Sequence, residues 1–191
     1  TAVCGNCGVG FAPARPDRRQ WLIGLMEGVE DIPGSALAEG IRWDWESFPE
    51  YLDALERSPL ALDLGTHVPH GAVRAYVMGE RGARNEAATA DDIAQMYRIV
   101  REGLEAGALG FSTSRTLGHR AVDGEPVPGT FAQEDELFGI GRALGDSGRG
   151  VFELAGAGAA GDGAGDPPDS ALREIEWMQR LAAAIRRPVS F

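Results

Sequence analysis

Residues 89–112 read TADDIAQMYRIVREGLEAGALGFS, and this stretch predicts a helix that runs directly into a buried strand. Its apolar residues recur at helical spacing, at Ile93, Met96, Tyr97, Val100 and Leu104. Thr89 and Asp92 resemble a capping box with Asp in place of Glu, which marks the start of the helix. Gly107 ends the helix, and residues 108–112 form the next strand. A helix that leads into a buried strand is the repeating unit of a parallel α/β sheet.

The same unit recurs before and after this stretch. Strands are expected at residues 60–68, 150–154 and 187–191, with residues 1–3 as the end of an earlier strand. One further helix is expected to begin at a capping box of Thr130 and Gln133 and to run to about Gly145. Another carries Leu172, Ile175, Met178 and Ile185 at helical spacing. We therefore predict five parallel strands with helices outside, and a mobile Gly/Ala-rich loop over residues 155–165.

The segment of residues 17–58 is longer than a single crossover between strands requires. They contain expected helices at about 21–29 and 49–55, an irregular stretch at 30–34, and an aromatic cluster of Trp43, Trp45 and Phe48. We interpret this segment as an extended helical crossover or insertion within one domain that spans residues 1–191.

Composition excludes several classes of function. The chain has 191 residues, of which 43% are hydrophobic and 25% charged, as in soluble globular proteins. Its net charge of −11 repels phosphate backbones, so we expect no nucleic-acid partner. No apolar run approaches the roughly 20 residues that cross a bilayer, so we expect no membrane partner and a cytoplasmic location. Both ends resemble interrupted strands, which suggests an internal fragment of a longer protein.

Residues able to carry chemistry follow the strands, where parallel α/β folds bind their ligands. Cys4 and Cys7 form a C-x-x-C pair, which suits a redox dithiol, half of a zinc site, or two small residues beside a Gly-rich turn. His67 and His70 could be metal ligands or a general base, because neutral imidazole does both near pH 7. Alternatively, one of these histidines caps a turn and the other is exposed.

A third group follows the strand at residues 108–112. Ser112, Ser114 and Arg115 combine hydroxyls with a guanidinium, and His119 lies a few residues further on. Arg offers a bidentate fork to carboxylates, so this group suits a substrate carboxylate. The alternative is a polar loop that binds no ligand.

Several short segments, taken together and in this order, resemble one known family. They are GNCG at residues 5–8, AP at 12–13, VEDIP at 29–33, HGAVR at 70–74 and EAGALGFS at 105–112. The combination is similar to the D-aminoacylase (N-acyl-D-amino-acid deacylase) branch of the metal-dependent amidohydrolase superfamily. The resemblance implies part of a TIM-type (β/α)8 barrel, roughly strands two to six. It also implies hydrolysis of N-acyl amino acids, typically of D configuration, with zinc as the cofactor.

The resemblance assigns expected roles to individual residues. Cys7 matches the cysteine that binds zinc in that branch, and His70 and Arg74 match its GH-x-x-LR segment. These two residues, with Ser112, Ser114 and Arg115, are the candidates for substrate binding. The H-x-H metal pair and the catalytic Asp, the general base, are expected outside residues 1–191. The branch also has a His at the end of strand five, where this chain has VFELA at 151–155, and Glu153 is a candidate substitute.

Two other functions stay open. A barrel without a metal would act as a binding protein, which the missing strand-five His favours. A redox protein would use Cys4 and Cys7, and would need their Cα atoms about 4.4–6.8 Å apart. An incomplete barrel exposes two sheet edges, so we expect self-association or association with the remainder of the parent chain.

Overall fold

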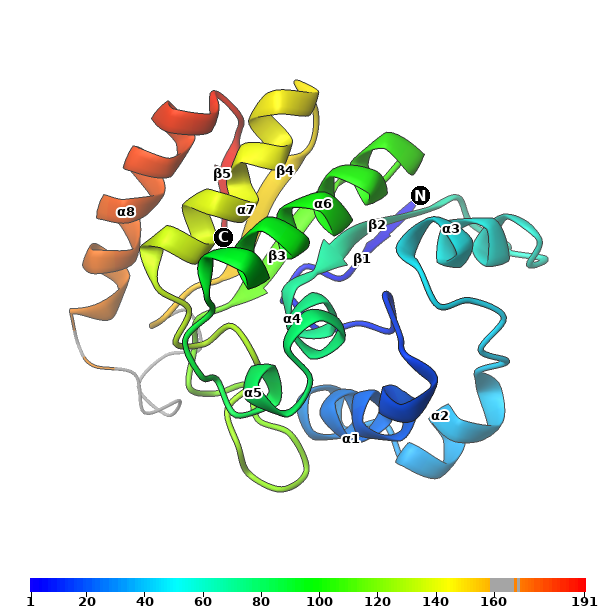
Figure 1. The fold of residues 1–191 in the computed structure, drawn as a ribbon. Helices are drawn as coiled ribbons and strands as arrows, with labels where there is room; N and C mark the ends of the chain where they lie inside the picture. Colours follow the sequence, from blue (N-terminus) through cyan, green and yellow to red (C-terminus); the bar gives the residue numbers. More distant parts are fainter. Residues whose placement is uncertain (159–166, 168) are drawn as a thin grey trace.

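The computed structural model describes residues 1–158, 167 and 169–191, and it contains one parallel sheet (Figure 1). The strands are β1 (Ala2–Cys4), β2 (Leu64–Pro69), β3 (Gly110–Ser114), β4 (Val151–Ala155) and β5 (Val189–Ser190). They lie side by side in the order of the sequence, and each is parallel to the next. This confirms the prediction of five parallel strands. Sequential parallel order is the arrangement found in a barrel of alternating strands and helices.

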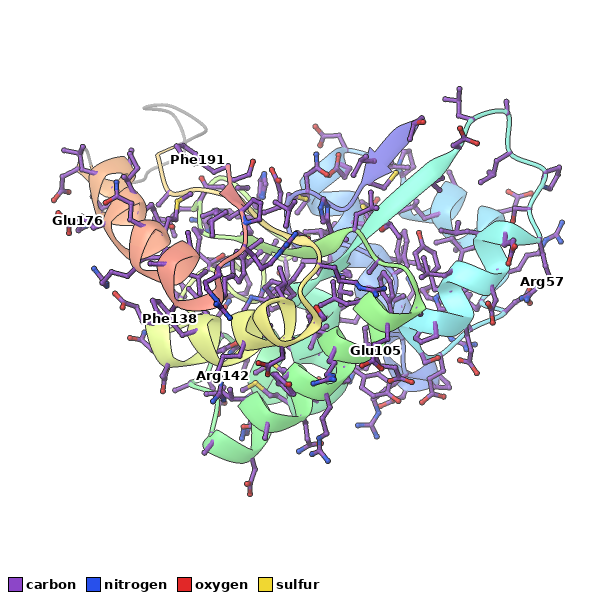
Figure 2. All side chains as sticks on the ribbon, turned by 90° about the horizontal axis from the view of Figure 1, so that it is seen from above. Arg57, Glu105, Phe138, Arg142, Glu176 and Phe191 are labelled. Atoms are coloured by element: carbon purple, nitrogen blue, oxygen red, sulfur yellow. The ribbon has the colours of Figure 1, made fainter. Side chains whose placement is uncertain are left out.

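Helices connect the strands, and several of them pack against one face of the sheet. They are η1 (Pro16–Arg18), α1 (Arg19–Glu30), α2 (Gly34–Gly40), α3 (Phe48–Glu56), α4 (His70–Met78), α5 (Glu80–Ala83), α6 (Ala90–Ala106), α7 (Glu134–Ser147) and α8 (Ser170–Ile185). The view from above shows α6 and α7, with Glu105 and Arg142, on one side of the strands (Figure 2). In the part of the chain that the structure describes, no helix is long and apolar enough to span a membrane.

The main core lies between the sheet and these helices. Val68, Phe111 and Phe152 occupy paired positions on neighbouring strands, and all three are fully buried against the helices. Their helical partners include Leu104 of α6 and Leu144 of α7. Burial of each such side chain contributes about 1.5–3 kcal/mol to folding. Since side chains alternate along a strand, the residues next to these three point to the opposite face of the sheet.

The boundaries of α6 follow the sequence prediction. The backbone N–H of Asp92 donates to Thr89 Oγ1 at 3.2 Å, and the N–H of Thr89 donates to Asp92 Oδ2 at 2.9 Å. This reciprocal pair is the capping box. Gly107 ends the helix with a φ of +122°, a conformation that favours glycine.

Other boundaries differ from the prediction. The capping box of Thr130 and Gln133 is wrong, because Gln133 precedes α7 without a side-chain cap and the Thr130 hydroxyl donates to the carbonyl of Val127. β2 begins at Leu64 rather than at residue 60, since Leu60 and Leu62 are exposed. Helices α2, α4 and α5 were not predicted. Most of the loop expected at residues 155–165 lies outside the described residues.

Residues 17–58 hold most of η1 and all of α1, α2 and α3, and they contribute four of the five rings in a row of aromatic side chains. The row runs Phe11, Trp43, Trp45, Tyr51 and Phe48, with neighbouring ring centroids 5.0–5.8 Å apart. The indole N–H of Trp45 donates to the carbonyl of Phe11 at 2.8 Å, which fixes the ring at the centre of the row. Aromatic pairs at these distances stabilise beyond the area that they bury.

The long connection from β3 to α7 contains a turn that lies directly on α1. Arg120 and Pro126 form an antiparallel bridge across this turn. A Cβ added at Gly28 of α1 would lie 2.4 Å from the carbonyl carbon of Ala121, and the Val122 N–H donates to the carbonyl of Gly24. The connection after β3 is therefore held against α1. So close an approach is possible because Gly24 and Gly28 of α1 have no Cβ atom.

Candidate functional site

The face of the sheet opposite the helices carries polar side chains. Val68, Phe111 and Phe152 point to the helices, so the alternation of side chains places His67, Ser112 and Glu153 on the other face. Ser112 and Glu153 are register partners on β3 and β4, and His67 on β2 pairs with Gly110. In a barrel this face is the interior, and ligands bind toward the carboxyl ends of its strands.

His67 is buried on this face, with 6% of its surface exposed. Its Nδ1 atom has no hydrogen-bond partner among the described residues. Burial lowers the pKa of His67, although the charge of Glu153 partly opposes this effect. The imidazole is therefore neutral at pH 7 and offers a lone pair.

Ser112 ties the loop after β1 to the centre of the sheet. The N–H of Gly8 donates to Ser112 Oγ at 3.2 Å. A Cβ at Gly8 would lie 2.6 Å from Thr113 Cα, and Gly8 has a φ of +77°, so this close approach requires glycine. Glu153, the register partner of Ser112, is half-buried. Its carboxylate makes no hydrogen bond or ion pair within the described ranges.

Cys7 lies in the loop beyond the carboxyl end of β1, packed beside the hydrophobic cluster of α1. Its Sγ is 3.9 Å from Glu30 Oε1. Burial raises the pKa of the Cys7 thiol, so it is protonated at neutral pH without a cation nearby. Cys4 is exposed at the end of β1, and both cysteines are free. The role of Cys7 as a zinc ligand thus remains a prediction. These observations do not support a redox function of Cys4 and Cys7.

His70 and Arg74 lie on α4, completely buried among internal partners. His70 Nδ1 is 2.8 Å from Thr113 Oγ1, and its Nε2 is 2.8 Å from Glu136 Oε1. Arg74 forms an ion pair with the same carboxylate and also donates to the carbonyl of Glu86. The expectation of a capped turn with one exposed histidine is wrong. The role of His70 and Arg74 in substrate binding remains a prediction. In this structure the two side chains connect α4 to β3 and α7.

The charges in this network are well defined. Burial, the largest effect, lowers the pKa of His70, so the imidazole is neutral. It donates its Nε2–H to the Glu136 carboxylate and accepts a hydrogen bond from the Thr113 hydroxyl at Nδ1. Burial opposes ionisation of Glu136, but the hydrogen bonds from His70 and Arg74, together with the charge of Arg74, outweigh it and lower its pKa to about 2. One carboxylate and one guanidinium therefore neutralise each other in the interior, as buried charges require.

Arg115 and Ser114 point in opposite directions at the end of β3. Arg115 donates to the carbonyls of Thr130 and Ala132, each at 2.9 Å, and lies 3.4 Å from Glu174 Oε2. These partners belong to the helix side of the sheet. Ser114 is fully buried on the interior side, with its Oγ 3.0 Å from His119 Nδ1. The sequence analysis placed Ser112, Ser114 and Arg115 in one substrate-binding group. In the structure only the two serines lie on the barrel face.

Sequence reasoning missed Glu136 and Thr113, which hold His70. A signal for Glu136 was present, because it shares a helical face with Ile140 and Leu144, both fully buried. An acid on the apolar face of a helix requires a buried partner. Thr113 had no comparable signal.

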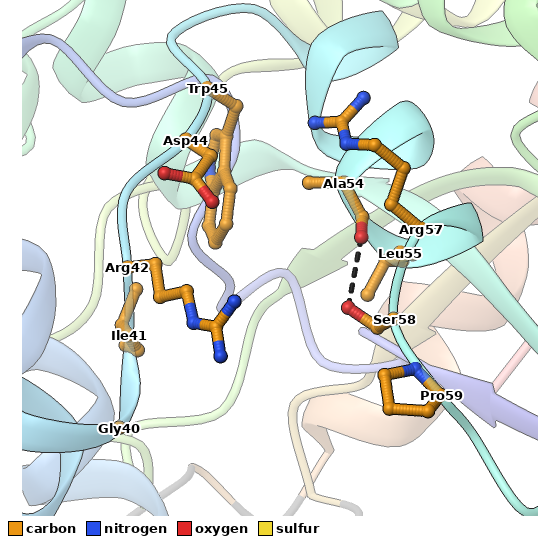
Figure 3. Close-up of a pocket in the computed structure, with 10 residues that line it drawn as sticks. All are labelled: Gly40, Ile41, Arg42, Asp44, Trp45, Ala54, Leu55, Arg57, Ser58 and Pro59. Atoms are coloured by element: carbon orange, nitrogen blue, oxygen red, sulfur yellow. Dashed lines mark hydrogen bonds between the residues drawn. The ribbon is translucent and has the colours of Figure 1, made fainter.

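A separate cavity of about 480 Å³ lies in the insert, between the α2–α3 connection and the end of α3 (Figure 3). Arg42 and Arg57 approach it from two sides, and Trp45, Ile41 and Pro59 add apolar surface. None of the interior polar residues of the sheet lines this cavity. It is therefore not part of the candidate site.

The interior face offers metal donors of the right kind. An unpartnered imidazole nitrogen at His67 and a free carboxylate at Glu153 are both zinc-type ligands, as is the Cys7 thiol. No three His, Cys, Asp or Glu side chains in the described part of the chain come together closely enough to hold an ion. These residues are thus ligands of the zinc type taken singly, but the described part of the chain does not assemble them into a coordination sphere.

Five parallel strands in sequential order, with polar groups on the face away from the helices, define a segment of a barrel-type α/β protein. The chain belongs to the amidohydrolase family, whose profile matches residues 1–191. This family membership agrees with the resemblance found in the sequence.

Individual relatives agree with this family. D-aminoacylase from Alcaligenes xylosoxydans xylosoxydans is 35% identical over 113 residues, which are 59% of this chain and 20% of that protein. N-acyl-D-aspartate deacylase from the same organism is 34% identical over 144 residues, 75% of this chain and 24% of that protein. A structure of D-aminoacylase described as having a binuclear metal center matches 98% of this chain and 33% of its own length, with 27% identity and a TM-score of 0.67.

The chain thus spans a fifth to a third of the relatives that it matches. Its five strands correspond to part of the D-aminoacylase barrel, which confirms the expected fold class.

Proposed function

We propose that the protein containing this chain hydrolyses N-acyl amino acids, typically of D configuration, to a carboxylate and a free amino acid. The observation that carries the proposal is the structural match of 98% of the chain to D-aminoacylase. The polar interior face at His67, Ser112 and Glu153 supports it, because ligands of barrel enzymes bind there.

We propose zinc as the cofactor, with Cys7 as one ligand. When bound in such a site, zinc polarises the amide carbonyl and supplies hydroxide at neutral pH. Ser112 and Ser114 lie on the barrel face and are proposed to donate hydrogen bonds to the substrate. Arg115, whose guanidinium is engaged by carbonyls of residues 129–132, is proposed to shape the loop over the substrate.

His70 and Arg74 are proposed to support substrate binding indirectly, by holding β3 in position. Their shared partner Glu136 and the hydrogen bond to Thr113 fix the strand between Ser112 and Ser114. Catalytic groups need support of this kind, because small displacements reduce the rate strongly.

The experiment measures hydrolysis of N-acetyl-D- and N-acetyl-L-amino acids by the protein that contains this chain. We expect turnover of D substrates that a chelator abolishes and zinc restores. Cys7→Ser should lower both bound zinc and turnover, whereas the matched control Cys4→Ser should change neither. Turnover that is insensitive to chelators, or the absence of turnover in a zinc-loaded protein, would contradict the proposal.

A second candidate is a binding protein with the same barrel and no catalysis. It is favoured by Glu153 at the position where the related branch has a histidine, and by the absence of a three-donor cluster within the described residues. Calorimetry separates the two functions. Binding of an N-acetyl-D-amino acid by a protein that takes up no zinc, without release of acetate, indicates the metal-free binding protein.

A further inference from the structure

We propose that the cavity at the α2–α3 connection binds a small organic anion, a carboxylate or phosphate group carried on a planar apolar body. The cavity holds about 480 Å³, which lies in the range of small-molecule sites in proteins. It belongs to the helical insert, and His67, Ser112 and Glu153 of the interior face do not line it. This binding site is therefore separate from the site of the proposed function.

Two arginines provide the positive charge of the cavity. Arg42 reaches in from the α2–α3 connection, and Arg57 lies at the end of α3 on the opposite wall (Figure 3). Neither guanidinium forms a hydrogen bond or an ion pair within the described ranges, although the chain has 29 acidic residues and only 18 basic ones. Guanidinium groups bind carboxylates and phosphates through charge-assisted hydrogen bonds, so two free arginines on facing walls fit one anion.

The carbonyl groups at the end of α3 are already engaged. The backbone N–H of Arg57 donates to the carbonyl of Asp53 at 3.1 Å. The Ser58 hydroxyl donates to the carbonyl of Ala54 at 2.9 Å (Figure 3), and the Ser58 N–H donates to that of Leu55 at 3.0 Å. These bonds fix the turn that carries Arg57 and use its acceptors. The polar groups left free on this wall are therefore donors, which select a ligand with acceptor atoms.

Trp45 supplies a flat, rigid apolar surface beside the arginines. Its indole N–H donates to the carbonyl of Phe11 at 2.8 Å, and its ring centroid lies 5.0 Å from that of Tyr51. A ring held in this way loses little conformational entropy when a ligand packs on it. Ile41 and Pro59 extend the apolar surface. An anion with a planar apolar body can therefore fill the cavity, whereas a bare ion would leave this surface in water.

The backbone at Trp43 directs its two neighbours toward the cavity. Trp43 has a φ of +56°, a left-handed conformation that bulky residues rarely adopt. Its ring packs edge-on against Phe11, while Arg42 and Asp44 on either side line the cavity. The Asp44 carboxylate forms no ion pair with Arg42, so it reduces the positive charge of the cavity without occupying the guanidinium. Rare backbone conformations of this kind persist where the surroundings hold them, and they cluster at ligand sites.

The test is calorimetric titration of the protein that contains this chain with naphthoate and with naphthyl phosphate. The two probes carry the alternative head groups on the same planar body. We expect at least one of them to bind, and the tighter one identifies the head group. The neutral naphthamide should bind roughly tenfold more weakly, because it lacks the charge that the arginines recognise. Equal affinity for the amide, or no binding of either anion, would overturn the inference.

Variants locate the bound anion. Arg42→Gln and Arg57→Gln should each weaken binding of the tighter probe roughly tenfold, because each removes a charge-assisted contact. Arg142→Gln is the matched control, since Arg142 is exposed on α7, also has no ion pair among the described residues, and lies far from Arg57 (Figure 2). Asp44→Asn should strengthen binding about twofold, because it removes a repelling charge. Wild-type affinity in both Arg42→Gln and Arg57→Gln would place the anion elsewhere and contradict the site.

A second readout follows the tryptophans without altering the cavity. The chain has four, so heteronuclear NMR can follow each indole N–H. The bound naphthyl ring should shift the N–H signal of Trp45 and leave that of Trp177, which is buried on α8, unchanged. An unchanged Trp45 signal at saturating probe would contradict the site. None of these measurements depends on hydrolysis, so their outcome is independent of whether the protein is a deacylase.

Discussion

His70 Nε2 lies 2.8 Å from Glu136 Oε1, and this contact joins α4 to α7 across 66 residues of sequence. Both side chains are almost completely buried, and Arg74 binds the same carboxylate.

Removal of the Glu136 charge should destabilise the fold strongly. Glu136→Gln leaves the buried Arg74 guanidinium without a counter-charge, and loss of one partner of a buried pair costs about 3–5 kcal/mol. Urea denaturation measures the change in the free energy of unfolding. Glu134→Gln, which breaks the exposed pair of the same helix with Arg180, should cost at most about 1 kcal/mol. Equal losses in the two variants would contradict the buried network.

The free energy of unfolding should decrease as pH falls from 7 to 5. The pKa values of His67 and His70 are lowered in the folded state, so the unfolded chain takes up protons that the folded chain does not. This stability is present above the unfolded pKa of about 6.5 and is lost as the pH falls through the folded values. Urea midpoints at pH 7, 6 and 5 measure the effect. His70→Gln should flatten the dependence, and an unchanged slope would contradict the assignment.

Gly28→Ala should destabilise the turn that lies on α1. The added methyl would meet the backbone of Ala121 at 2.4 Å, and neither backbone can give way easily. Overpacking of this kind costs about 1–3 kcal/mol. Gly40→Ala is the control, because a Cβ there meets nothing within 4 Å. Thermal melts compare the two variants, and a Gly28→Ala protein as stable as wild type would show that the contact is loose.

Residues 1–191 alone should have no amidase activity. The described residues bring no three metal donors together, and metal-hydroxide chemistry requires a preorganised site. An assay with N-acetyl-D-amino acids, with and without zinc, measures this directly. Metal-dependent hydrolysis by residues 1–191 would mean that the site has been misplaced.

Residues 1–191 in isolation should associate with other copies of the same chain. β1 and β5 each pair with one strand only, and Val3 and Phe191 are 47% and 62% exposed. Such edges pair readily with another chain. Light scattering at micromolar concentration should therefore give a mass above 20.2 kDa, the mass of one chain. A stable monomer, with no other protein on a gel, would contradict this prediction.

Local patterns predicted much of the fold. The capping box at Thr89, the helical spacing that follows it and the stop at Gly107 are short-range signals, and α6 follows them. The start of α4 could not be predicted in this way, because His70-Gly71 directly after Pro69 resembles a turn. Packing decides there, since a Cβ at Gly71 would lie 3.0 Å from the carbonyl oxygen of Gly8.

The candidate site was less predictable than the fold, because it depends on the direction of side chains. Ser114 and Arg115 are adjacent in sequence, but their side chains point to opposite faces of the sheet. Which of the two faces the barrel interior depends on the register of β3, which the sequence does not give. His67 and Glu153 stand apart in the sequence, and nothing local indicates that they share a face.

The aromatic row of the insert makes the chain suitable for spectroscopy. Trp43 and Trp45, whose rings are 5.7 Å apart, are close enough for their electronic transitions to couple. Coupled, rigidly held indoles give a strong near-ultraviolet circular dichroism signal, which disappears when the rings become free to rotate. The insert therefore carries its own optical reporter, a coupled pair of indoles that responds when its packing loosens.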